Sequence, residues 1–142
     1  MIIDFYHLTA SPLERVLPSV AEKVLAGGER LLVVAGPERI GQLDELLWTY
    51  ARDSFLPHGR EQPESQPVLL SAEPEAANGA TNIALGDGRW RDEALGFARA
   101  FYFFDDGGRD AAREAWRSLK GKPEVEARYW KQDERGKWVQ GP

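Results

Sequence analysis

The chain of 142 residues contains no cysteine, one methionine and two histidines. Without cysteine, disulfides, zinc–thiolate centres and cysteine nucleophiles are excluded. The histidines, His7 and His58, lack the HxxxH or HExxH spacing that binds a metal ion. No apolar run approaches the roughly 20 residues of a membrane span, and the first residues lack the layout of a signal peptide. A cytoplasmic location is therefore expected.

The composition is that of an ordinary globular protein, with 42% apolar and 29% charged residues, and the length predicts a single domain over residues 1–142. The net charge of −5 conceals an asymmetry. Residues 1–108 hold 9 basic and 17 acidic side chains, whereas residues 109–142 hold 9 basic and 6 acidic ones. The acidic body disfavours tight direct binding of nucleic acid, while the basic C-terminal quarter suits an acidic partner.

Apolar patterns along the chain predict alternating strands and helices. Strands are expected over residues 2–8, 31–35, 68–70, 82–85 and 100–104, which are rich in β-branched, leucine and aromatic residues. Helices are expected from Ser11-Pro12 to Gly27-Gly28, from Pro37 onward, over residues 92–99 and over residues 111–120. Pro18 indicates a kink in the first helix or a later start near Leu17. Residues 60–67 are expected to form a surface loop, and residues 126–131 and 137–140 a terminal hairpin.

The order strand–helix–strand–helix predicts an α/β fold, a Rossmann-like three-layer sandwich with a mostly parallel central sheet and helices on both faces. Such folds often bind nucleotides, but this chain lacks a phosphate-binding loop. The turns Thr9-Ala10-Ser11-Pro12 and Ala35-Gly36-Pro37 are short of glycine, and the motif GxxxxGK[ST] is absent. Nucleotide binding is therefore disfavoured.

No catalytic constellation is found, and no cofactor is implied. His7 lies in the first expected strand, where a packed or hydrogen-bonded histidine is the ordinary case. Asp105-Asp106 follows the strand expected over residues 100–104 and has two interpretations. The pair is either a cation ligand or base, or, more commonly, a turn cap that favours the N-terminus of the next helix. We expect that the protein is not an enzyme.

The second expected helix places Trp48 away from its own apolar face. Ile40, Leu43, Leu46, Leu47 and Tyr50 share that face, and Trp48 lies roughly 130° from its middle. The segment that follows sets three further side chains nearby, namely Phe55, Pro57 and His58. Either a neighbouring loop of the same domain covers these rings, or they form a protein–protein contact.

The late helix carries a basic stripe beside a tryptophan. Its buried face consists of Ala112, Ala115 and Leu119, and Trp116 borders that face. The stripe consists of Arg109, Arg113, Arg117 and Lys120, which lie within roughly 80° of one another. It is either a solvated face or a site for an acidic peptide that ends in an apolar residue. In the second case guanidinium groups hold carboxylates while the indole covers the apolar group.

The central residues 43–59, LDELLWTYARDSFLPHG, resemble the signature of the chi subunit of bacterial DNA polymerase III holoenzyme, part of its clamp-loader assembly. Further similarities follow in the order of that family. Asp4-Phe5-Tyr6-His7-Leu8 resembles its first strand, Asn82-Ile83-Ala84-Leu85 a middle strand, and Ala112-Arg113-Glu114-Ala115-Trp116-Arg117 its late basic helix. Residues 60–79 and those after Gly121 are the least similar.

The resemblance implies a non-catalytic adaptor that links the clamp loader to single-stranded DNA-binding protein and meets DNA only indirectly. It implies that the acidic C-terminal tail of that protein, which ends in proline and phenylalanine, binds at the late helix. The implied tail-site residues are Phe104, Arg109, Arg113, Trp116, Arg117 and Lys120. A second face, consisting of Trp48, Phe55, Pro57 and His58, is implied to bind a psi subunit or a repair-type helicase. The aromatic and basic segment after Gly121 either extends the tail site or covers the sheet edge.

Two other functions stay open. One is a Rossmann-like enzyme that binds a nucleotide or small ligand through an atypical loop, against which the missing glycines argue. The other is direct binding of single-stranded DNA through the basic stripe and the C-terminal tryptophans, which predicts a steep dependence of affinity on salt.

Overall fold

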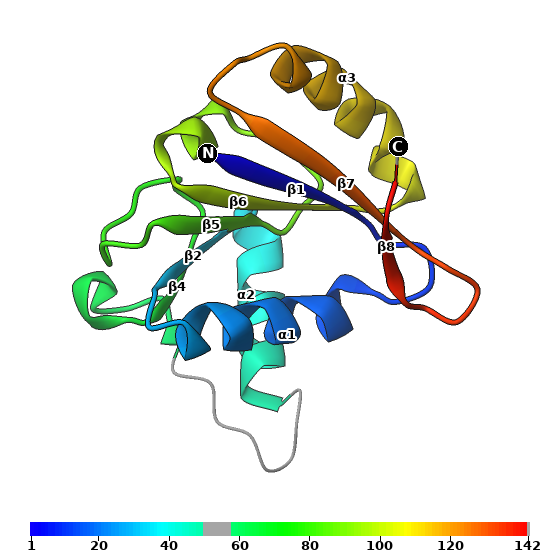
Figure 1. The fold of residues 1–142 in the computed structure, drawn as a ribbon. Coiled ribbons are helices and arrows are strands. Elements are labelled where there is room, and N and C mark those ends of the chain that lie inside the picture. Colours follow the sequence, from blue (N-terminus) through cyan, green and yellow to red (C-terminus); the bar gives the residue numbers. More distant parts are fainter. Residues whose placement is uncertain (50–57, 142) are drawn as a thin grey trace.

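The computed structural model describes residues 1–49 and 58–141. The helices are α1 (Leu13–Ala26), α2 (Pro37–Thr49) and α3 (Arg109–Lys120), with short 3-10 helices η1 (Pro63–Ser65), η2 (Asp92–Gly96) and η3 (Asp106–Gly108). The strands are β1 (Ile2–His7), β2 (Leu31–Val34), β3 (His58–Gly59), β4 (Val68–Ser71), β5 (Asn82–Leu85), β6 (Arg99–Phe104), β7 (Glu126–Gln132) and β8 (Trp138–Gln140). Figure 1 shows these elements arranged around one twisted sheet. No helix in the described ranges has the length and apolar character needed to cross a membrane.

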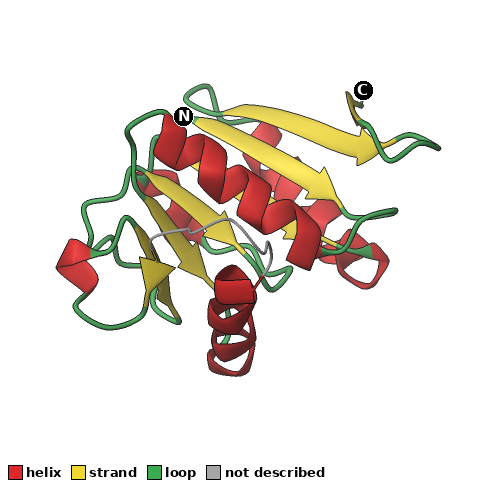
Figure 2. Ribbon diagram, turned by 90° about the horizontal axis from the view of Figure 1, so that it is seen from below, coloured by secondary structure: helices red, strands yellow, loops and turns green. Residues whose placement is uncertain are grey.

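The strands join one sheet in the order β3-β4-β2-β5-β6-β1-β7-β8. Neighbouring strands are parallel throughout except for β7 and β8, which are antiparallel. Helices lie on both faces of this sheet, as the view in Figure 2 shows. The predicted α/β sandwich with a mostly parallel central sheet is therefore confirmed.

The alternation of side chains along β6 divides the core into two layers. Phe101 and Phe103 pack in the layer of α1 and α2, with Leu17 and Leu43 among their neighbours. Tyr102 and Phe104 point to the opposite face and pack in the layer of α3. The continuous apolar run of β2 is buried over its whole length, as expected of a strand covered on both faces.

Two helix boundaries differ from the sequence prediction. Helix α1 begins at Leu13 with Pro12 at its N-cap, and it continues through the buried Pro18. The missing hydrogen bond of this proline is tolerated because a long apolar face of α1 is buried around it. The helix expected over residues 92–99 is only the 3-10 helix η2, and β6 begins at Arg99. A single buried side chain, Ala94, anchors η2, which is too little for a stable amphipathic helix.

The predicted C-terminal hairpin is confirmed, and its first strand, β7, pairs in parallel with β1. A buried carboxylate on β1, Asp4, ties three strands together. It accepts hydrogen bonds from Arg99 on β6 at 2.8 Å and from Arg128 and the Trp130 indole on β7 at 2.8 and 2.9 Å. Burial by itself raises the pKa of Asp4, but the hydrogen bonds from Arg128, Trp130 and Arg99 outweigh it and hold the pKa below its ordinary value.

Candidate functional site

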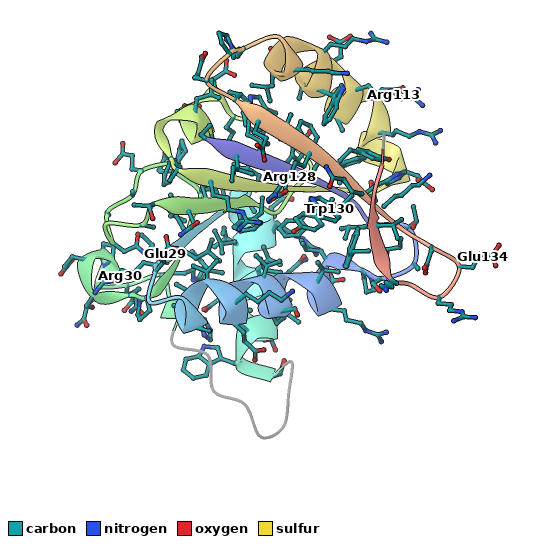
Figure 3. The ribbon with its side chains drawn as sticks, in the orientation of Figure 1. Glu29, Arg30, Arg113, Arg128, Trp130 and Glu134 are labelled. Atoms are coloured by element: carbon teal, nitrogen blue, oxygen red, sulfur yellow. The ribbon has the colours of Figure 1, made fainter. Side chains whose placement is uncertain are left out.

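A pocket of about 310 Å³ lies between α3 and the sheet, at the strands β6, β1 and β7. Its walls combine aromatic rings with basic side chains from segments that are far apart in the sequence. The lining residues are Phe5, His7, Phe104, Arg109, Ala112, Arg113, Trp116 and Tyr129. In Figure 3, Arg113 points away from α3 at the end of the molecule where this helix lies over the sheet.

The position of α3 follows from its sequence. The Asp105 side chain accepts a hydrogen bond from the Gly108 amide at 3.1 Å, so this residue caps the turn before the helix, as expected. Ala112, Ala115 and Leu119 are buried and attach the helix to the sheet. The small alanines let α3 approach closely and leave the flanking long side chains at the rim of the pocket.

The apolar part of the pocket is built from rings that meet edge to face. Trp116 stands edge-on to Phe5, with ring centroids 5.2 Å apart, and edge-on to Tyr129 at 6.3 Å. Phe104 lies 6.3 Å from Tyr129 in a tilted arrangement. These rings border the hollow, and an aromatic lining of this kind suits an apolar or aromatic group of a ligand.

The polar part of the pocket is ordered by hydrogen bonds. His7 is buried, and its Nε2 lies 2.7 Å from the exposed Asp106 carboxylate while its Nδ1 lies 2.9 Å from the Tyr129 hydroxyl. These two hydrogen bonds hold the Tyr129 phenol ring in the wall of the pocket. Burial raises the pKa of Tyr129, against the opposing charges of Arg109 and Arg113. The two guanidinium groups thus lie near this wall, where they favour an anionic group.

The residues implied for the tail site do not all reach the pocket. Phe104, Arg109, Arg113 and Trp116 line it. Lys120 lies against the outer side of the site, with its Nζ 5.7 Å from the centroid of the Trp116 ring. Arg117 is exposed on α3 but lies outside the lining.

Sequence reasoning did not assign Phe5 and His7 to the site, and it left open whether the segment that contains Tyr129 extends the tail site or covers the sheet edge. Phe5 and His7 share one face of β1, which a period of two along the strand would have shown. Tyr129 enters the pocket because β7 pairs with β1 in parallel, with Tyr129 opposite Phe5. No local signal in the sequence announces that pairing.

The face around Trp48 has a different geometry. The Trp48 side chain is 54% exposed, so the prediction that it points away from the core of its helix is confirmed. Its ring centroid lies 4.6 Å from that of His58, whose side chain is buried and whose Nε2 lies 3.2 Å from the Asp44 carbonyl oxygen. His58 therefore supports the indole from below and is not itself a surface contact. Phe55 and Pro57 lie outside the described residues.

The N-terminus of α2, where a Rossmann-like enzyme would place a phosphate, is occupied by a carboxylate. Asp87 accepts a hydrogen bond from the Gly36 amide at 2.8 Å and forms an ion pair with Arg91. The hollow beside it, of about 650 Å³, is also lined by Asp105 and by Glu14, which pairs with Arg39. The Gly36 amide that a phosphate would need already donates to Asp87, which counts against the nucleotide-binding alternative. Within residues 1–49 and 58–141 no cluster of three or more His, Asp or Glu side chains is suited to hold a metal ion.

A comparison with curated proteins gives no match for this chain. A comparison with protein families matches residues 1–123 to the family described as DNA polymerase III chi subunit, HolC. This match includes β1, α2 and α3, and it ends just before β7. The chain therefore belongs to the DNA polymerase III chi subunit family and is an accessory protein of DNA replication.

Proposed function

We propose that the pocket beside α3 binds the acidic C-terminal tail of single-stranded DNA-binding protein. The protein would thereby link the clamp loader of DNA polymerase III to single-stranded DNA that is coated by that protein. The observation that carries this proposal is one hollow in which the aromatic walls Trp116, Phe104 and Tyr129 meet Arg109 and Arg113.

The pocket matches the two chemical features of such a tail. The terminal phenylalanine ring enters the hollow between the edge-on rings, and its α-carboxylate meets the arginines, as charge-assisted hydrogen bonds favour. The acidic residues that precede the terminus then pass over the outer side of α3. Arg117 and Lys120 are exposed there and are placed to attract these residues by charge.

A calorimetric titration with a synthetic tail peptide tests the proposal. Arg113→Ala is expected to weaken binding by about 1–3 kcal/mol, because one charge-assisted contact is lost while the fold is kept. Arg135→Ala, which removes an exposed arginine in the turn between β7 and β8, is the matched control and should bind as the parent does. A peptide without its terminal phenylalanine should bind more weakly to the parent protein and to the Arg135→Ala control. Equal affinity of the shortened and full peptides would show that the site reads charge alone.

We further propose that the face around Trp48 binds a psi subunit or a repair-type helicase. The exposed indole, held from below by His58, supports this proposal. The partner is identified by a pull-down from the source cell with parent and Trp48→Ala baits, in which the variant should fail to retain it.

A further inference from the structure

The face of the sheet opposite α3 carries a groove that the chi family match does not cover in full. Helix α1 lies over only part of this face, and β1 and β7 run beside it between α1 and α3 (Figure 1). Two adjoining hollows of about 370 and 190 Å³ follow α1 here and share the residues Tyr6, Val20 and Lys23. One wall of the larger hollow comes from β7 and β8, which lie beyond residue 123, where the family match ends.

The floor of the groove is a row of aromatic rings. Tyr6 stacks on Phe103 with centroids 5.3 Å apart and planes at 19°, and on Trp130 at 6.4 Å and 15°. Trp138 stands edge-on to Tyr6 at 5.1 Å. Phe103 and Trp130 flank Tyr6 on its two sides, so Tyr6 offers only a ring edge, whereas Trp130 and Trp138 are partly buried and line the groove.

Basic side chains line the same groove. Arg15 and Lys23 project from α1, are exposed, and belong to none of the ion pairs formed among residues 1–49 and 58–141. Their separation of eight positions corresponds to about 12 Å along the helix axis. On the sheet side, Arg99 and Arg128 pair with the single carboxylate of Asp4, and Arg128 also lies 3.9 Å from the carboxylate of Glu126. The lining of the two hollows contains three basic side chains and one acidic side chain, Glu29, whereas the chain as a whole carries a net negative charge.

We propose that this groove binds single-stranded DNA, with phosphates on Arg15 and Lys23 and bases against Trp138 and the accessible part of Trp130. A positive channel with a row of aromatic side chains is the usual arrangement for binding a single strand without sequence preference, because each base presents a π-face. An acidic peptide would use the charges but not an extended row of rings. The acidic remainder of the chain keeps the affinity for DNA low. The groove therefore binds the strand only beside a DNA polymerase, where other subunits hold the DNA at a high local concentration.

Fluorescence anisotropy with a labelled oligothymidine of about 16 nucleotides at low salt tests this proposal on the full chain. Charge reversal of two groove residues, Arg15→Glu with Lys23→Glu, is compared with reversal of two α3 residues, Arg113→Glu with Lys120→Glu. Both double variants change the net charge equally. The groove variant is expected to weaken DNA binding by about tenfold or more and to reduce the slope of log affinity against log salt by about 1.4, the loss of two phosphate contacts. The α3 variant should stay within about twofold of the parent.

Three outcomes would overturn the proposal. The first is that the parent protein fails to bind the oligonucleotide at low salt, and the second is that the two double variants lose affinity equally. The third is that polyglutamate displaces the labelled oligonucleotide as well as unlabelled DNA does. The last result would assign the groove to an acidic peptide. Melting temperatures show whether the variants are folded, and Arg15→Gln with Lys23→Gln replaces the reversal if the latter unfolds. Binding by the groove does not depend on the tail pocket, because the two lie on opposite faces of the sheet.

Discussion

Trp116 and Trp48 both lie on helices, but their surroundings differ. Trp116 forms one wall of a hollow, edge-on to Phe5 and Tyr129, with arginines at the rim. Trp48 is 54% exposed and contacts the buried His58. A hollow with charge at its rim suits the end of an extended chain, whereas a projecting ring suits insertion into a folded partner. The presence of a tryptophan therefore does not by itself identify the partner. The shape of the surrounding surface and the charge of the neighbouring side chains decide which kind of ligand the ring can bind.

The two regions also depend on the fold to different degrees. The tail pocket needs three strands from distant parts of the chain, β1, β6 and β7, and it loses a wall if β7 detaches. The described part of the Trp48 face needs only α2 and the adjacent β3. Perturbing one region should consequently leave the other intact, which the following variants test.

The largest effect is expected for Asp4→Ala. Three donors, on Arg99, Arg128 and Trp130, lose their common buried acceptor, and the free energy of unfolding should fall by about 3 kcal/mol. The partial exposure of both arginines keeps the loss at the low end of the range for a broken buried ion pair. Urea unfolding measures it, with Glu134→Ala in the hairpin turn as an exposed control that should change stability by less than about 0.5 kcal/mol. Asp4→Ala should lower the affinity for the tail peptide more than the affinity for the partner that binds at Trp48. An equal loss of both affinities would contradict the proposal that the two sites are independent.

Trp48→Ala tests the other region. It should weaken the psi or helicase contact by about 2 kcal/mol or more, because exposed aromatic anchors dominate such interfaces. Tail-peptide affinity should stay within about 0.5 kcal/mol, as expected for separate sites. Melting temperature and both affinities are measured on the same variant. If Trp48 were a core residue instead, stability would fall by about 3–5 kcal/mol and both activities would be damaged together.

Tyr129→Phe tests the role of the Tyr129 hydroxyl in the tail pocket. The ring stays in the wall, but the hydrogen bond to His7 Nδ1 is lost, and tail affinity should fall by about 1 kcal/mol. Calorimetry with the tail peptide measures the change. A loss above about 1.5 kcal/mol, the range for a hydrogen bond to a charged group, would mean that the hydroxyl contacts the ligand directly instead of only orienting the ring.

The smallest effect concerns pH. The pKa of Asp4 in the folded state lies below its ordinary value of 3.8, so the stability that this carboxylate contributes is present above that value and is lost as the pH falls through the lowered pKa. Asp4→Asn should therefore flatten the dependence of unfolding free energy on pH below about 4. Urea unfolding at several acidic pH values measures the slope. An unchanged slope would show that other carboxylates govern the response to acid.

The amino-acid sequence determined those features that depend on local order. The apolar run of β2 predicted a buried strand, the spacing in α2 predicted an outward Trp48, and the period of α3 placed Arg109 and Arg113 beside Trp116. Each of these follows from the fixed geometry of one helix or one strand, in which the direction of a side chain depends only on its position along the element. The family resemblance of residues 43–59 likewise needed no structure and is confirmed at the level of the family.

Tertiary structure alone decided which elements meet. The pairing of β7 with β1 brings Tyr129 opposite Phe5 and completes the pocket, although their sequence positions are far apart. In the same way, packing buried His58 beneath Trp48 and set the Asp87 carboxylate at the N-terminus of α2. A parallel strand pair has no connecting turn to fix its register, so its partners are chosen by the burial of whole faces rather than by any local motif. The sequence therefore specified the direction of each side chain, and the sheet order specified its neighbours.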